Sequence, residues 1–152
     1  MSTAGPAVKI RVLPHGRGLP LPERASAGSA GYDLRAAIEE SQSVEPGQRV
    51  LVPTGLVVEI PAGWEGQVRP RSGLALRHGI TLPNAPGTID SDYRGEIGVI
   101  LANLGGESHT IERGDRIAQL VFAPVAEVKW VVADDLADSD RGAGGFGSTG
   151  GG

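Results

Sequence analysis

The sequence contains no cysteine, and this absence removes several kinds of chemistry at once. Without thiols there is no disulfide, no cysteine nucleophile and no thiolate zinc site. Only three histidines occur, His15, His78 and His109, and none stands at metal-ligand spacing. No apolar run approaches the ~18 residues that a membrane-spanning helix needs, and the first residues lack the basic and apolar regions of a secretory signal. We therefore expect a cytoplasmic protein that has no membrane partner.

Aromatic residues and positive charge are also scarce. Phe, Trp and Tyr make up only 4% of the chain, so a core must be built from Val, Ile, Leu and Ala. The net charge of −4 argues against a nonspecific nucleic-acid binder. A polyanionic substrate would therefore need a local cluster of cations or a metal ion.

Glycine and proline, by contrast, are abundant, with 24 and 11 residues in a chain of 152. They form turn signals at Pro46-Gly47, Pro53-Thr54-Gly55, Pro61-Ala62-Gly63 and Pro86-Gly87. Short apolar pieces lie between and beyond these turns, at residues 8–13, 49–52, 56–60, 66–68, 97–102, 116–123 and 125–132. This spacing predicts an all-β domain, an antiparallel barrel or sandwich. The only helix we expect is short, residues 73–78, with Ser72 as its N-cap.

The C-terminal part differs in composition. We expect a β-barrel domain over residues 1–133 and, over residues 134–152, an acidic linker and a flexible glycine-rich arm. Residues 141–152 contain seven glycines, which cannot form a core element. Two interpretations are open: a disordered tail, or an arm whose backbone N–H groups bind phosphate. Phe146 favours the arm, because a pure linker rarely carries one apolar ring, and this ring could stack on a base.

Residues 84–95, Asn-Ala-Pro-Gly-Thr-Ile-Asp-Ser-Asp-Tyr-Arg-Gly, are the richest in chemical groups. We interpret them as a β-hairpin that forms the floor of an active site. Asp90 can point into a pocket and position a water molecule for attack. Asp92 is expected to support the turn.

Three further positions suggest a phosphate site. Arg71 and Ser72 precede the short helix, whose N-terminus attracts anions, although an ordinary helix cap explains them equally well. Gln119 stands between apolar residues and needs polar partners, either a phosphate or a neighbouring carbonyl. Asp33 is explained either by a surface position on an edge strand or by contact with Mg²⁺ through water.

Taken in order, five segments resemble the five motifs of the trimeric dUTP nucleotidohydrolases (dUTPases). The segments are residues 30–37, 70–75, 84–95, 113–121 and 141–150. The resemblance implies a jelly-roll-like subunit in a homotrimer whose C-terminal arms are exchanged between subunits. It implies hydrolysis of dUTP to dUMP and pyrophosphate with Mg²⁺ as cofactor, which supplies dUMP for thymidylate synthesis and keeps uracil out of DNA.

The same resemblance implies a role for each residue. Asp90 would activate the water that attacks the α-phosphate, and Tyr93 would lie under the deoxyribose. Asp33 would hold Mg²⁺ through water. The uracil edge would be read by Asn84 and by the backbone of Thr88, Ile89 and Asp90, and Gly98 could add a contact through its backbone. The phosphate contacts would come from Arg71, Ser72, Gly73 and Gln119. The arm would close the site through Arg141, Phe146, Ser148 and Thr149.

Two alternatives remain open. One is a dCTP deaminase, which resembles dUTPases in fold and also binds a pyrimidine triphosphate without zinc. The sequence from Thr88 to Tyr93 matches the hydrolase better. The other is a catalytically silent nucleotide-binding trimer that acts through protein contacts, against which the presence of Asp90 and of the arm both argue.

Overall fold

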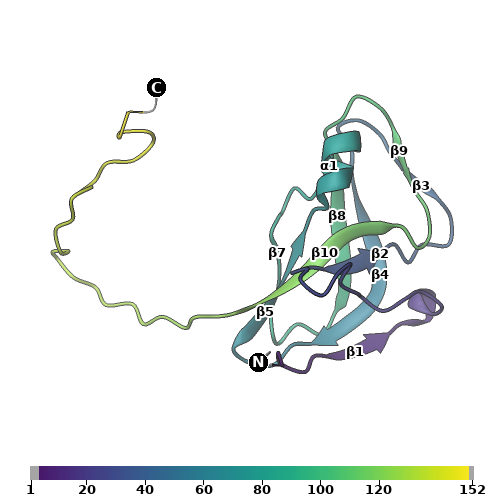
Figure 1. Ribbon diagram of the computed structural model, residues 1–152, viewed down its shortest axis with the longest axis horizontal. Helices are drawn as coiled ribbons and strands as arrows, with labels where there is room; N and C mark the ends of the chain where they lie inside the picture. Colours follow the sequence, from purple (N-terminus) through teal and green to yellow (C-terminus); the bar gives the residue numbers. More distant parts are fainter. Residues whose placement is uncertain (1–3, 151–152) are drawn as a thin grey trace.

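Two four-stranded antiparallel sheets form the body of the computed structural model, which describes residues 4–150 (Figure 1). The first sheet has the order β1-β4-β8-β6 and the second the order β2-β10-β5-β7, while β3 and β9 form a separate pair. The strands are β1 (Lys9–Val12), β2 (Tyr32–Arg35), β3 (Gln42–Val44), β4 (Arg49–Glu59), β5 (Trp64–Arg69), β6 (Ile80–Thr81), β7 (Gly87–Ile89), β8 (Glu96–Asn103), β9 (His109–Ile111) and β10 (Arg116–Pro124). The prediction of an antiparallel all-β, jelly-roll-like domain is confirmed.

The core lies between the two large sheets and is aliphatic, as the scarcity of aromatic residues requires. In β8 every second residue is buried, which turns Ile97, Val99 and Leu101 inward. They belong to one buried cluster with residues of the second sheet, such as Leu34 and Leu120. Burial of a side chain of this kind contributes roughly 1.5–3 kcal/mol, so both sheets depend on this shared layer.

The predicted turn at Pro53-Thr54-Gly55 is wrong, because β4 runs through it as one strand of 11 residues. Its register against β8 shifts between Pro53 and Val57, so that extra residues form a bulge. Gly55 in the bulge has φ +70°, and a Cβ at this position would lie 2.5 Å from the Cα of Gly16. The Thr54 hydroxyl donates a 2.6 Å hydrogen bond to the Ile97 carbonyl. The turn-forming residues therefore bend the strand without ending it.

The short helix is present but begins one residue earlier than predicted. Helix α1 spans Ser72–His78, and its N-cap is Arg71, which makes no side-chain capping hydrogen bond. Ser72 is thus the first helical residue and its proposed capping role is wrong. The helix ends at Gly79, which has φ 68°. Within residues 4–150, no helix is long and apolar enough to cross a membrane.

The segment 84–95 is not a hairpin. β7 pairs with β5 in the second sheet, whereas β8 pairs with β4 and β6 in the first. The two strands that flank the turn therefore belong to different sheets, and the chain from Asp90 to Gly95 crosses between them. We call this crossing the arch. Two apolar runs that flank a turn are typical of a hairpin, but here Ile89 and Ile97 both point into the layer between the sheets.

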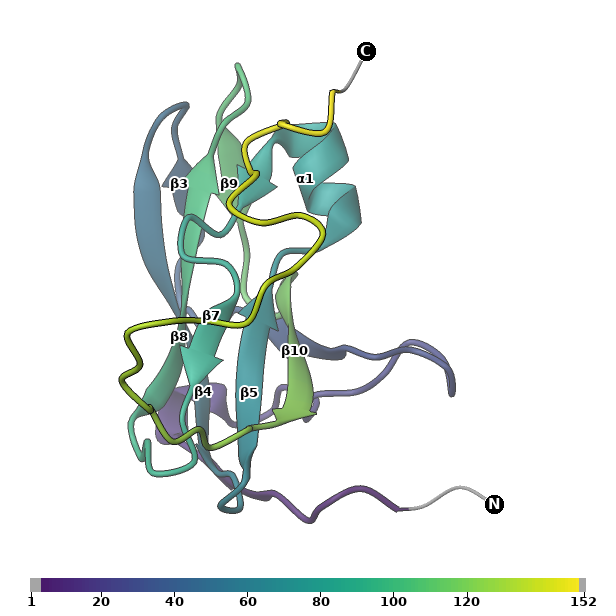
Figure 2. The same cartoon turned by 90° about the vertical axis from the view of Figure 1, so that its left-hand side faces the viewer.

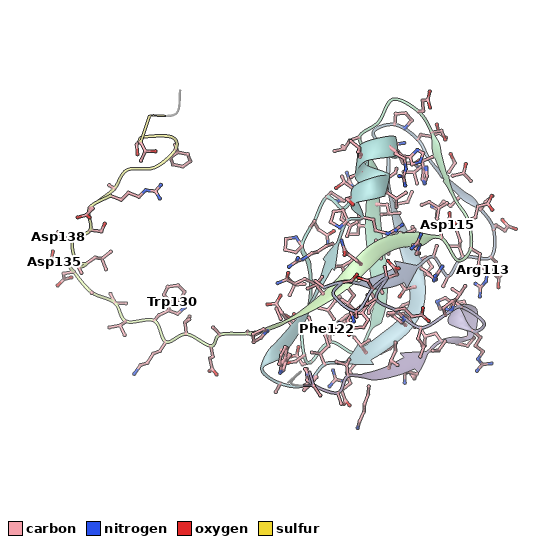
Figure 3. All side chains as sticks on the ribbon, in the orientation of Figure 1. Arg113, Asp115, Phe122, Trp130, Asp135 and Asp138 are labelled. Carbon is pink, nitrogen blue, oxygen red and sulfur yellow. The ribbon has the colours of Figure 1, made fainter. Side chains whose placement is uncertain are left out.

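The chain leaves the body after β10 and continues as an extended segment (Figures 1 and 2). Residues 125–132 are not a strand, so the prediction of an apolar strand there is wrong. Figure 3 shows Trp130 on this segment, well away from the sheets. Val128, Trp130 and Val132 are exposed because no strand within residues 4–150 lies beside them. Their apolar character favours burial against another molecule.

Candidate active site

The arch and the strands beside it enclose a pocket of about 190 Å³, which we call the arch pocket. Six residues singled out in the sequence line it together: Asn84, Thr88, Ile89, Asp90, Tyr93 and Gly98. Val68 of β5 and Leu82 complete an apolar side. Glu96 lines it as well, so the pocket combines two carboxylates, one amide and one phenol with a small apolar surface. This combination suits a flat polar ring carrying a sugar.

The turn of the arch is held by backbone and arginine contacts. The Tyr93 N–H donates to the Asp90 carbonyl at 3.1 Å. Arg94 donates to the carbonyls of Ser91 at 2.6 Å and Tyr93 at 3.1 Å, and to the Glu59 carboxylate at 3.3 Å. Within residues 4–150, Asp92 forms no side-chain hydrogen bond or ion pair, so the side-chain support expected of Asp92 comes from Arg94.

Strand β7 offers unpaired backbone groups to the pocket, because it lies at the edge of its sheet. Its inner side pairs with β5, with Thr88 opposite Gln67 and Gly87 opposite Val68. Its outer side carries donors and acceptors in the spacing of a missing strand. The Ile89 side chain is only 8% exposed and belongs to the core. Thus Ile89 can contact a ligand only through its main chain.

The Tyr93 ring forms another wall of the arch pocket. Its hydroxyl donates a 2.8 Å hydrogen bond to the Glu96 carbonyl. The ring covers Gly95 so closely that a Cβ there would lie 2.5 Å from Tyr93 Cζ. Tyr93 is still 42% exposed, so it remains accessible from the pocket that it lines. On β8, Gly98 has no side chain to fill the pocket and leaves its backbone accessible.

A second group of predicted residues gathers at the β2–β10 side of the second sheet, and we call Asp33, Arg71, Ser72 and Gln119 the phosphate cluster. Three chain segments meet here because β10 lies between β2 and β5. Gln119 is paired with Asp33 on one side and with Arg69 on the other. Its amide donates a 2.9 Å hydrogen bond to the Pro70 carbonyl and so fixes the turn that carries Arg71 and Ser72. The neighbouring carbonyl thus partners Gln119, and its second N–H can serve an anion.

Asp33 lies on edge strand β2, as one of its two explanations required. Its carboxylate is 3.7 Å from Arg71 Nε and 3.6 Å from Arg116 Nη1, with a side chain 18% exposed. One partly buried carboxylate between two guanidinium groups is not a metal cage. Among residues 4–150 there is no cluster of three or more His, Cys, Asp or Glu residues that could hold a metal ion.

A cavity of about 270 Å³ adjoins the phosphate cluster and is lined in part by Arg71, Asp115, Arg116 and His109. His109 packs against His78 with ring centroids 4.6 Å apart. Burial lowers the pKa of His109 from its ordinary value of 6.5, and nearby His78 lowers it further, while Asp115 acts in the opposite direction. Neutral imidazole is therefore favoured beside the arginines.

The arm residues do not meet either group. Arg141, Phe146, Ser148 and Thr149 lie on the extended segment, and the Phe146 ring is fully exposed. Figure 3 labels Asp135 and Asp138 on the same segment, far from Arg113 and Asp115 on the body. Arg141 Nε donates a 2.6 Å hydrogen bond to the nearby Gly144 carbonyl. The predicted site residues thus form three separate groups within one chain.

Sequence reasoning missed two residues at these sites. Arg116 contacts Asp33, and Glu96 lines the arch pocket. Both are charged residues at the first position of a strand. In a sequence this position indicates a solvent-facing end, so only the placement of neighbouring strands gives either residue a role.

Fold and site together define a nucleotide-binding β-sandwich, and comparison with known proteins identifies its family. The family model for dUTPase matches residues 17–150. A deoxyuridine 5'-triphosphate nucleotidohydrolase of Rhizobium leguminosarum bv. trifolii (strain WSM2304) is 57% identical over 147 residues, which cover 95% of this chain and 94% of that protein. One from Methylocella silvestris is 61% identical over 145 residues, which cover 94% and 91%.

Solved structures agree. The Staphylococcus bacteriophage 80alpha dUTPase G164S mutant with dUpNHpp superposes with a TM-score of 0.81 at 26% identity, covering 95% of this chain and 98% of that one. This chain belongs to the dUTPase family.

Proposed function

We propose that this chain hydrolyses dUTP to dUMP and pyrophosphate. The observation that carries the proposal is the arch pocket, in which Asp90, Asn84 and Tyr93 lie beside the free edge of β7. The Rhizobium and Methylocella relatives, named as hydrolases of this nucleotide, support it. The reaction would take place in the cytoplasm, supply dUMP for thymidylate synthesis and keep uracil out of DNA.

The edge of β7 is the reader of the base in this proposal. Uracil presents two carbonyl acceptors and one N–H donor along one edge, which backbone groups of Thr88, Ile89 and Asp90 can match as a strand partner would. Asn84 adds an amide. Cytosine reverses donor and acceptor at two of these atoms, and a site built on hydrogen bonds discriminates by roughly 10⁴–10⁵ against such a mismatch. Tyr93 lies under the sugar and leaves no room for a 2'-hydroxyl.

Asp90 is the chemical group of the proposed site. Its exposed carboxylate lines the arch pocket at the point where the chain leaves β7. From there it would accept a proton from the water that attacks the α-phosphate, and pyrophosphate would leave. A positioned general base of this kind contributes typically 10²–10⁴ in rate.

The phosphate cluster would hold the triphosphate. Arg71 supplies a cation, Gln119 an N–H and Ser72 a hydroxyl, and Gly73 allows a close backbone approach. Mg²⁺ fits this donor set as an ion bound mainly by substrate phosphates and water, because such ions take few protein ligands. Asp33 would hold it through water. When bound, Mg²⁺ neutralises phosphate charge that a chain of net charge −4 cannot balance.

We further propose a homotrimer with exchanged arms. The support is that the arch pocket, the phosphate cluster and the arm share no lining residue within one described chain. A site that needs all three groups can be completed by three copies. Arg141, Phe146, Ser148 and Thr149 of one copy would close over a site formed by the others, with Phe146 on the uracil. Light scattering in solution should give a mass three times that of the chain.

One assay separates this function from its rivals. The purified protein is incubated with Mg²⁺ and dUTP, dCTP, dTTP or UTP, and pyrophosphate and ammonia are both measured. Pyrophosphate from dUTP above all other substrates is the expected result. Ammonia from dCTP would instead indicate a deaminase. Tight dUTP binding with neither product would indicate a catalytically silent nucleotide-binding protein.

A further inference from the structure

Glu96 is the residue of the arch pocket to which the proposed reaction assigns no role. It opens β8 immediately after the arch, and its side chain is 30% exposed. The carboxylate turns toward the body of the domain. Its Oε1 accepts a 2.9 Å hydrogen bond from the Gly55 N–H and contacts Nε2 of His15.

These contacts join Glu96 to the bulge of β4. Gly55 occupies that bulge, and its carbonyl accepts a 2.8 Å hydrogen bond from the Leu13 N–H. Gly16 lies so near that a Cβ on it would stand 2.8 Å from the Gly55 oxygen. His15 and Gly16 belong to the 3₁₀ turn η1 (Pro14–Gly16). The Glu96 carboxylate thus fastens the first residue of β8 to two elements packed against each other.

The main chain of the same residue holds the pocket wall. The Tyr93 hydroxyl donates its 2.8 Å hydrogen bond to the Glu96 carbonyl. Gly95, between them, is covered by the Tyr93 ring. The position of the ring therefore depends on where residues 95 and 96 lie, and the Glu96 side chain anchors them.

We propose that Glu96 is a positioning residue that selects deoxyribose over ribose by fixing the Tyr93 ring; this rests on the proposed function. Loss of the carboxylate frees the start of β8 and leaves the Gly55 N–H without its acceptor. The Glu96 carbonyl then no longer holds the phenol in one place. A 2'-hydroxyl is tolerated once the wall can move, so discrimination falls while the chemistry at Asp90 continues.

The test compares kcat/KM for dUTP and for UTP in Glu96→Ala, Glu96→Gln and wild type. Both substrates are measured on one preparation, so their ratio does not depend on how much of the protein is folded. Glu96→Ala should lower the dUTP:UTP ratio by about tenfold or more, within the range that a hydroxyl in a pocket is worth. Glu96→Gln keeps an acceptor for the Gly55 N–H and should retain most of the ratio.

Glu40→Ala is the matched control. Glu40 is an exposed carboxylate that forms no side-chain hydrogen bond or ion pair within the described residues, so its ratio should equal that of wild type. Tyr93→Phe removes only the hydrogen bond to the Glu96 carbonyl and provides a second route if Glu96→Ala does not fold. It should lower the ratio in the same direction.

The inference is overturned if Glu96→Ala keeps the wild-type ratio, or if Tyr93→Phe does so where Glu96→Ala does not fold. Equal losses in Glu96→Ala and Glu96→Gln would also overturn it, because the acceptor would then not be the cause. A wild-type protein that fails to turn over dUTP would refute the proposed function itself, which is a separate outcome.

Discussion

Replacing Gly31 with alanine should damage the phosphate cluster through Gln119. A Cβ on Gly31 would overlap the Gln119 side-chain oxygen and stand 3.0 Å from both Cβ and Cδ of that residue. The backbone of Gln119 is paired with β2 and β5 on either side, so the side chain must move instead, which would break its 2.9 Å hydrogen bond to the Pro70 carbonyl. The turn that carries Arg71 would then be released.

The expected magnitude has two parts. Overpacking of this kind costs about 1–3 kcal/mol of the free energy of unfolding, which at this chain length lowers Tm by roughly 2–12 °C. A hydrogen bond from Gln119 to a charged phosphate is worth about 1.5–3 kcal/mol. Its loss should therefore raise KM for dUTP by about 10–100-fold and change kcat less.

Thermal unfolding measures the loss of stability, and pyrophosphate release at varied dUTP concentration measures the change in KM. Gly28→Ala is the matched control for both. Gly28 has no atom within 4 Å of an added Cβ, so that substitution changes only backbone freedom. Gln119→Ala, alone and combined with Gly31→Ala, tests whether the effect of Gly31→Ala passes through Gln119. If it does, the free-energy changes of the two substitutions should not add. If Gly31→Ala leaves Tm and KM equal to those of Gly28→Ala, the reasoning is refuted.

Three further predictions concern the chemistry, the arm and the pH dependence. Asp90→Asn should bind a non-hydrolysable dUTP analogue within a few-fold of wild type while kcat falls by about 10²–10⁴; near-normal turnover would remove Asp90 from its role. Deletion of residues 141–152 should leave the oligomer folded by light scattering and Tm but cripple turnover; full activity would make the arm a mere tail. Because the pKa of His109 is lowered in the folded chain, the unfolded chain binds the proton more readily, so stability should fall as pH drops below about 6.5 toward the lower folded value. His109→Asn should flatten that decline in Tm, and an unchanged slope would contradict the assignment.

The sequence pattern predicted the structure correctly where the structure depends on residues that are neighbours along the chain. The short apolar piece at residues 97–102 predicted a strand, and β8 includes all of it, with Ile97, Val99 and Leu101 pointing inward. The chemical content of residues 84–95 indicated a pocket, and Asp90 and Tyr93 line one. Both inferences succeed because side-chain period and residue chemistry are properties of neighbours along the chain.

The sequence pattern gave wrong predictions where the local structure depends on contacts with a distant part of the chain. Pro53 and Gly55 predict a turn, but the hydrogen bond from Thr54 to the Ile97 carbonyl keeps β4 continuous as a bulge. Residues 125–132 have the composition of a strand, yet a strand needs a partner, and no strand in the described part of the chain lies beside them. Neither outcome is encoded within the segment itself.

The sequence by itself determined the aliphatic core, the class of fold and the candidates for the site, because these follow from composition and local spacing. Only the tertiary structure decided that residues 84–95 cross between two sheets and leave β7 as a free edge. It also decided that Gln119 pairs with Asp33 and bonds to the Pro70 carbonyl beside Arg71. In the same way it placed the Glu96 carboxylate against the Gly55 N–H. The physical reason is that backbone groups in a sheet form hydrogen bonds with strands that are distant in sequence. Which strand lies beside a given group depends on how the whole chain packs.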